Sequence, residues 1–153
     1  VDFVIPHQTG TLGMVSVQDG PLESLRQITS TFPHWFTPAL GAVKSPQDLC
    51  CDQSQLIQHI APRPVGVTEG YFDPWASYWL SLKTLQRTQS AYAQVYAARQ
   101  LPMRPLHTYT FREDSDVLKA PLLHVTLWHP HTMHGDYWRV IGSFLHAQWV
   151  SDL

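Results

Sequence analysis

Apolar residues recur at helical spacing through the middle of the chain. The apolar positions in this stretch are Trp75, Tyr78, Trp79, Leu82, Leu85, Tyr92, Val95 and Tyr96. Asp73 is a suitable N-terminal cap, Pro74 suits the first helical position, and Pro102 excludes a longer helix. This pattern predicts one long helix from Asp73 to about Gln100, with Leu82 on its buried face and Thr88 on its polar face.

Two shorter helices are predicted in the first half of the chain. The first spans about Pro21 to Thr31, where Leu25 and Ile28 share one face, and Pro33 ends it. The second starts at Ser45, which forms a capping box with Asp48, and continues to the prolines at 62 and 64. The residues before these helices, Val1 to Gln18, favour an extended conformation because short apolar runs alternate with glycine.

After the long helix the apolar period changes from 3.6 to 2 residues, which is typical of strands. Segments Leu106 to Arg112 and Leu122 to Trp128 alternate, and the acidic residues 113–116 between them suggest a hairpin turn. Tyr137 to Val150 favours a third strand, bent at Gly142. A helix is the alternative for this segment, because its apolar residues also fit helical spacing.

Together these elements predict an α+β fold in which residues 1–153 form a single domain. The long helix packs on an antiparallel β-meander, and the two shorter N-terminal helices cover the same face. A chain of 153 residues is long enough to enclose a hydrophobic core.

Charged residues make up only 14% of the chain, against about 25% in an average soluble domain. A surface with so little charge has weak electrostatic repulsion toward other proteins. We therefore predict a non-catalytic assembly subunit that binds a protein partner or forms a homo-oligomer. The aromatic residues Trp75, Tyr78 and Trp79 cover more than one helix face and are the candidate interface. The chain has no basic cluster of the kind that binds nucleic acid, and its apolar runs are too short for a membrane span. We therefore predict neither nucleic-acid binding nor a membrane span.

Histidines gather in the last third of the chain. His129, His131 and His134 lie within six residues, and imidazole is a common ligand of Zn, Fe and Cu. These three residues are the candidate metal ligands, with Asp136 or Glu113 as a supporting carboxylate. Two alternatives to the assembly subunit stay open. One is a small metal-dependent enzyme that uses this loop, and the other is a module that holds a small apolar ligand between the long helix and the sheet.

Overall fold

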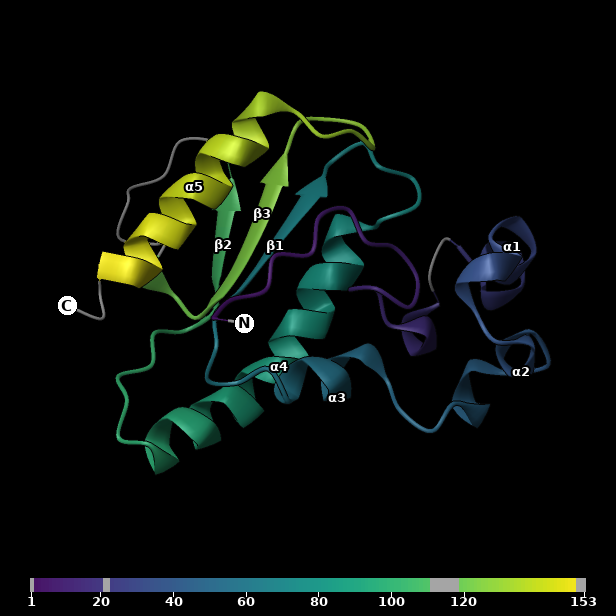
Figure 1. Ribbon diagram of the computed structural model, residues 1–153, viewed down its shortest axis with the longest axis horizontal. Coiled ribbons are helices and arrows are strands. Elements are labelled where there is room, and N and C mark those ends of the chain that lie inside the picture. Colours follow the sequence, from purple (N-terminus) through teal and green to yellow (C-terminus); the bar gives the residue numbers. More distant parts are fainter. Residues whose placement is uncertain (1, 21–22, 111–118, 151–153) are drawn as a thin grey trace.

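The computed structural model describes residues 2–20, 23–110 and 119–150. Its centre is a parallel sheet of three strands in the order β1-β3-β2 (Figure 1). The strands are β1 (Val65–Gly70), β2 (His107–Thr110) and β3 (Leu122–Leu127). In register, Val65 pairs with Leu122 and His107 pairs with Leu123. The N-terminal segment runs beside β1, where Val4 and His7 form parallel bridges to it.

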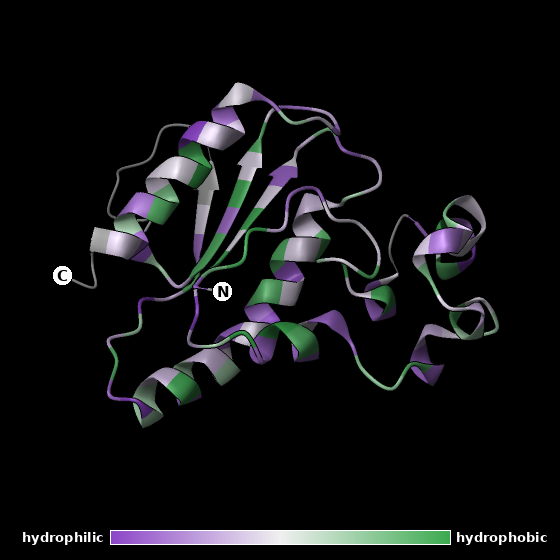
Figure 2. Ribbon diagram, viewed as in Figure 1, coloured by the Kyte–Doolittle hydropathy of each residue, from purple (hydrophilic) through white to green (hydrophobic). Residues whose placement is uncertain are grey.

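Two long helices cover opposite faces of this sheet, α4 (Tyr78–Ala98) on one and α5 (Gly135–Val150) on the other (Figure 1). Alternate residues of β3 therefore face different helices: Leu122 packs in the cluster of α4, and Leu123 packs in that of α5. Hydrophobic residues accordingly recur along β3, α4 and α5 (Figure 2). A parallel sheet needs this cover on both faces, because neither side can be left to solvent.

The remaining elements are short and lie in the first half of the chain. They are η1 (Val17–Asp19), α1 (Leu25–Thr31), η2 (Pro33–Trp35), α2 (Pro38–Gly41), η3 (Pro46–Asp48) and α3 (Gln53–Gln58). Ser45 and Asp48 form the predicted capping box, but it starts only η3, and a second box at Asp52 starts α3. Pro21 and Leu22, at the predicted start of the first helix, lie outside the described residues.

The predicted antiparallel meander is wrong, because β3 pairs in parallel with both of its neighbours. The acidic segment 113–116, interpreted as a hairpin turn, joins two parallel strands and lies outside the described residues. Strand β1 was not predicted at all. The segment predicted as a third strand is the helix α5, whose buried residues Tyr137, Val140, Ile141 and Phe144 follow helical spacing.

The long helix also differs from its prediction in start and orientation. It begins at Tyr78 with Ser77 at the N-cap, so Asp73 precedes it by several residues. Thr88, expected on the polar face, is fully buried, and its hydroxyl donates to the carbonyl of Thr84 at 2.9 Å. Threonine can occupy a buried helix face because its hydroxyl bonds to the preceding turn of the same helix.

Replacing Gly66 by alanine should destabilise the fold by about 1–3 kcal/mol, because it overpacks the contact between β1 and α5. A Cβ at Gly66 would lie 2.8 Å from Cε1 of the buried Phe144 ring. Gly142→Ala is the control: it lies on the exposed side of α5 with open space around it and should stabilise the helix by up to about 1 kcal/mol. Urea unfolding of both variants measures the difference, and equal stability would contradict this packing.

Candidate functional site

An aspartate and a histidine meet where two neighbouring strands end. Asp73 follows β1 by three residues, and His131 follows β3 by four. The carboxyl ends of parallel strands lie at the same edge of a sheet, and ligands of such sheets commonly bind there. Nδ1 of His131 lies 2.6 Å from Oδ2 of Asp73. The Asp73 side chain is 0% exposed and that of His131 is 56% exposed. The carboxylate is therefore shielded from solvent, and the imidazole is accessible to it.

Asp73 is fixed by the backbone that follows it. Its Oδ1 atom accepts hydrogen bonds from the N–H groups of Trp75 at 2.9 Å and Ala76 at 3.0 Å. These two bonds satisfy one oxygen and leave Oδ2 for the histidine. A carboxylate held in this way keeps a constant orientation toward its partner.

The loops that carry the two residues are in close contact with each other. The N–H of Tyr71 donates to the carbonyl of Leu127 at 2.8 Å, and the N–H of Phe72 donates to that of His129 at 3.2 Å. At Gly70 a Cβ would lie 2.5 Å from the carbonyl oxygen of His129. Glycine is therefore required there, because any side chain would push the two loops apart.

The N-terminal segment supports the histidine loop from the other side. Nε2 of Gln8 donates to the carbonyl of Pro130 at 3.0 Å and to the hydroxyl of Tyr137 at 3.3 Å. The ring of His7 packs edge-on against Tyr137, with 4.7 Å between the centroids. Burial lowers the pKa of His7, and the neighbouring His131 lowers it further. Gln8 has a positive φ of 47°, an uncommon conformation for a residue other than glycine.

The structure separates the three predicted metal ligands. His129 and His134 lie together beside Asp136, whereas His131 is engaged by Asp73. Metal binding by these three residues stays a prediction.

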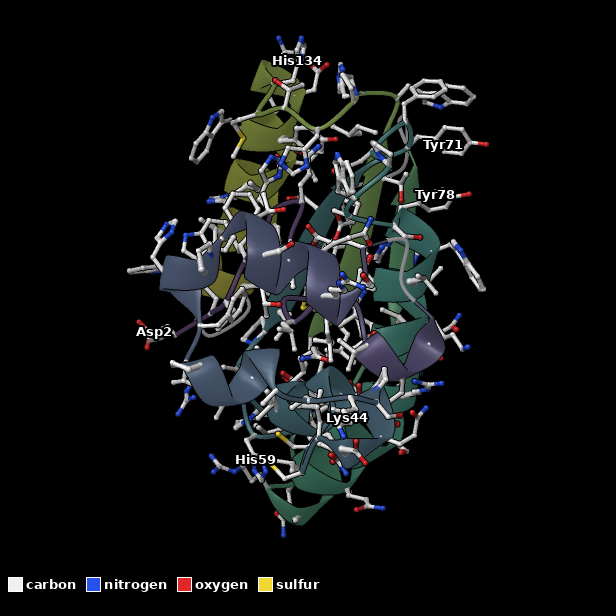
Figure 3. The ribbon with its side chains drawn as sticks, turned by 90° about the vertical axis from the view of Figure 1, so that its right-hand side faces the viewer. Asp2, Lys44, His59, Tyr71, Tyr78 and His134 are labelled. Atoms are coloured by element: carbon white, nitrogen blue, oxygen red, sulfur yellow. The ribbon has the colours of Figure 1, made fainter. Side chains whose placement is uncertain are left out.

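The three predicted interface residues lie at the start of α4 and before it. Trp75 and Trp79 are exposed, and Tyr78 is partly buried. Tyr78 stacks on Tyr71, which stacks in turn on Trp128 with 4.7 Å between the ring centroids. This edge of the molecule therefore presents exposed aromatic rings near Asp73, and Figure 3 shows Tyr71 and Tyr78 next to each other there. Their role as an interface remains a prediction.

A second polar group is buried beneath the first turn of α4. Oγ of Ser81 lies 2.9 Å from Nε2 of His124, and Glu69 is completely buried on the neighbouring strand. Burial raises the pKa of Glu69 well above its ordinary range, against the opposing effect of Ser81. Burial lowers the pKa of His124 to about 4. His124 is therefore uncharged at neutral pH, and burial favours the neutral form of Glu69 in the same way.

The Asp73–His131 pair has the geometry of a general base. A proton on Nδ1 is shared with the carboxylate, which leaves the lone pair of Nε2 free to accept a proton from a reacting group. Sequence reasoning had assigned Asp73 to a helix cap and His131 to a metal. The sequence offered two signals for this pair: an aspartate that follows one strand and a histidine that follows another. The aspartate was missed because strand β1 was not predicted.

Comparison with known proteins identifies several similar esterases. A CE15 esterase from a marine bacterial metagenome, described as promiscuous, superposes with a TM-score of 0.77 at 24% identity, over 95% of this chain and 36% of that one. A CE15 glucuronoyl esterase from Caldicellulosiruptor kristjansonii gives 0.70 at 19% identity, over 94% and 35%. A glucuronoyl esterase from Solibacter usitatus gives 0.69 at 19% identity, over 97% and 36%.

One curated relative adds a match in sequence. The carbohydrate esterase MZ0003, from an unknown prokaryotic organism, is 40% identical over 55 residues, which are 35% of this chain and 13% of that protein. No protein-family model matches the chain. The chain therefore spans about a third of the solved structures and a smaller part of the curated relative.

These findings correct the functional prediction. The similar proteins named above are esterases, so the predicted non-catalytic assembly subunit, with the absence of enzymatic activity that it implied, is wrong. The part of the prediction that concerns membranes is confirmed: among the described residues no helix has both the length and the apolar character of a membrane span. The likeness over nearly the whole chain shows that these residues adopt the parallel, α/β-hydrolase-like fold of the CE15 esterases.

Proposed function

We propose that this chain carries the acid and the base of an esterase that acts on carbohydrate esters, such as esters of a glucuronic acid. The observation that carries the proposal is the 2.6 Å contact between a fully buried Asp73 and a half-exposed His131 at the carboxyl edge of the sheet. The relatives that are described as carbohydrate or glucuronoyl esterases supply the substrate class.

In this mechanism His131 moves protons and Asp73 positions it. Nε2 of His131 takes the proton from a nucleophilic hydroxyl as that oxygen attacks the ester carbonyl. The same nitrogen then gives the proton to the departing alcohol, and water hydrolyses the acyl intermediate by the reverse sequence. The buried carboxylate of Asp73 holds the imidazole in the required tautomer and stabilises its positive charge.

The nucleophile belongs, on this proposal, to polypeptide beyond the 153 residues. In α/β-hydrolases the three groups follow one another in the order nucleophile, acid and histidine, and Asp73 and His131 occur in that order. Among the described residues, no serine, threonine or cysteine side chain forms a hydrogen bond with Nε2 of His131. The chain also matches only 36% of the solved esterase, which leaves room for the nucleophile elsewhere.

Aromatic side chains next to the pair support a carbohydrate substrate. Phe72 and Trp128 are exposed, and their ring centroids lie 5.5 Å apart. They flank the loops that hold Asp73 and His131. Exposed aromatic faces of this kind are uncommon on a surface without a ligand, and they can pack against the C–H groups of a sugar ring.

The test is hydrolysis of a methyl ester of glucuronic acid by the purified full-length protein. We expect wild type to release methanol and His131→Ala to be at least about a hundredfold slower, because a general base contributes about that much or more. His59→Ala is the matched control, since this exposed histidine lies at the opposite end of the molecule (Figure 3). An active His131→Ala variant would refute the assignment, and a wild type inactive on esters of sugar acids and acetylated sugars would refute the proposed function.

A further inference from the structure

Two histidines and one aspartate form a compact group on the loop between β3 and α5. Oδ2 of Asp136 lies 3.1 Å from Nδ1 of His134 and 3.4 Å from Nε2 of His129. The two imidazole rings stack with 4.1 Å between their centroids. One ligand atom of each residue lies within 4.8 Å of the other two.

These separations fit the ligands of a metal ion with tetrahedral coordination. Zinc binds imidazole nitrogen and carboxylate oxygen at about 2.0–2.2 Å, so neighbouring ligand atoms in a tetrahedral site lie about 3.3 Å apart. The two distances from Asp136 Oδ2 fall on either side of this value. The longer one, between His129 and Asp136, corresponds to a long and weak hydrogen bond. Two histidines with one carboxylate also leave a fourth position open for water or a ligand.

The orientation of His134 supports the same site. Its Nδ1 atom lies 3.3 Å from the backbone nitrogen of Asp136 and faces the carboxylate oxygen Oδ2 at 3.1 Å. The imidazole is therefore held beside the carboxylate, whose negative charge would attract a cation bound between the two atoms.

The surroundings leave the group accessible to an ion from solution. The side chains of all three residues retain solvent exposure, and Figure 3 shows His134 at the outer end of the molecule. Arg139 approaches the other carboxylate oxygen, Oδ1, at 3.4 Å and so leaves Oδ2 for the ion.

We propose that His129, His134 and Asp136 bind a divalent cation of the zinc class. Asp136 thus takes the place that the sequence had suggested for His131, which is engaged by Asp73. A bound ion would tie the start of the loop, at His129, to its end, at His134, and so brace the segment that carries His131. The cation site does not depend on ester hydrolysis.

Zinc titration of the untagged full-length protein tests this site. After removal of metal by a chelator, zinc is added in competition with a chromogenic zinc indicator. We expect one zinc ion per chain, and an affinity at least about a hundredfold weaker in His134→Ala and in Asp136→Asn, since even indirect ligand partners contribute tenfold to a hundredfold. Zinc should also raise the melting temperature of wild type and of neither variant, because it binds only the folded state.

Two further variants define the ligand set. His131→Ala and His59→Ala should bind zinc within about threefold of wild type, as expected for residues outside the site. Circular dichroism spectra like that of wild type establish that each variant is folded. The proposal is overturned if wild type binds no stoichiometric zinc, if Asp136→Asn binds it as tightly as wild type, or if His131→Ala loses it as His134→Ala does.

Discussion

On the proposed function, Asp73→Asn should lower the kcat of ester hydrolysis by about 10⁴-fold, the loss expected when the acid of such a pair becomes an amide. The amide oxygen can still accept the N–H groups of Trp75 and Ala76. The amide nitrogen then faces Nδ1 of His131 and donates to it. This forces the imidazole proton onto Nε2, which can no longer accept a proton from the nucleophile. KM should stay within a few-fold of wild type, because the Asp73 side chain has no exposed surface with which to touch a substrate.

The chain offers a matched control for this variant in Asp52. Asp52 is also a buried capping aspartate: it accepts the N–H of Ser54 and the hydroxyl of Ser16, and no histidine contacts it in the described residues. Asp52→Asn should lower stability by about 1 kcal/mol, as lost charge-assisted caps do, and leave kcat unchanged. Steady-state kinetics and urea unfolding of both variants separate the two effects. Equal kcat values for Asp73→Asn and wild type would exclude Asp73 as the acid.

The helices α1, α3 and α4 were predictable in part, because caps and prolines act locally. Prolines and capping boxes placed the breaks near residues 33, 62 and 102. The position of strand β3 was also predicted correctly, since its β-branched residues Val125 and Thr126 stand out. What failed was the pairing of strands. The sequence of a strand does not show whether its neighbour is parallel or antiparallel, because this depends on the path of the connecting chain. A short acidic segment between two strands resembles a hairpin turn.

The two errors at β1 and α5 share a physical cause. A strand buried on both faces has no polar alternation, and β1 also contains Gly66 and Gly70, which depress strand propensity. The helix α5 is rich in aromatic and β-branched residues, which favour strands when considered one by one. Its four-residue spacing was the better signal, because burial of one helix face outweighs the intrinsic preference of single residues.

The candidate site could be predicted only in part. The sequence indicated that the loop 129–136 carries chemistry, because histidines are concentrated there. It could not indicate that His131 separates from His129 and His134, since that depends on Asp73 reaching across from another strand. Asp73 is 58 residues away in the chain. Contacts between the ends of strands depend on the order of the strands in the sheet. The local pattern of apolar and polar residues does not specify that order.

Acidification should destabilise the fold through His124, by up to about 3 kcal/mol between pH 6.5 and 4. Burial lowers the pKa of His124 from 6.5 to about 4. In this interval the unfolded chain binds a proton that the folded chain does not, so the free energy of unfolding falls as pH falls, by about 1.4 kcal/mol per unit of pKa difference. The stabilisation is complete above pH 6.5 and is lost as pH approaches 4.

His124→Gln tests this origin, because glutamine can keep the hydrogen bond to Ser81 but does not titrate. Between pH 7 and pH 4 the free energy of unfolding should fall less in the variant than in wild type. The two losses should differ by about 2–3 kcal/mol, as measured by urea unfolding. His59→Gln, on the exposed surface, should follow wild type. Glu69 acts in the opposite direction: its raised pKa stabilises the fold below pH 4.5, and this stabilisation is lost as pH rises. If the free energy of unfolding of wild type and of His124→Gln falls equally with pH, His124 is not the group that titrates. If it falls less steeply below pH 6.5 in His124→Gln alone, the lost stability of wild type belongs to the imidazole beneath α4.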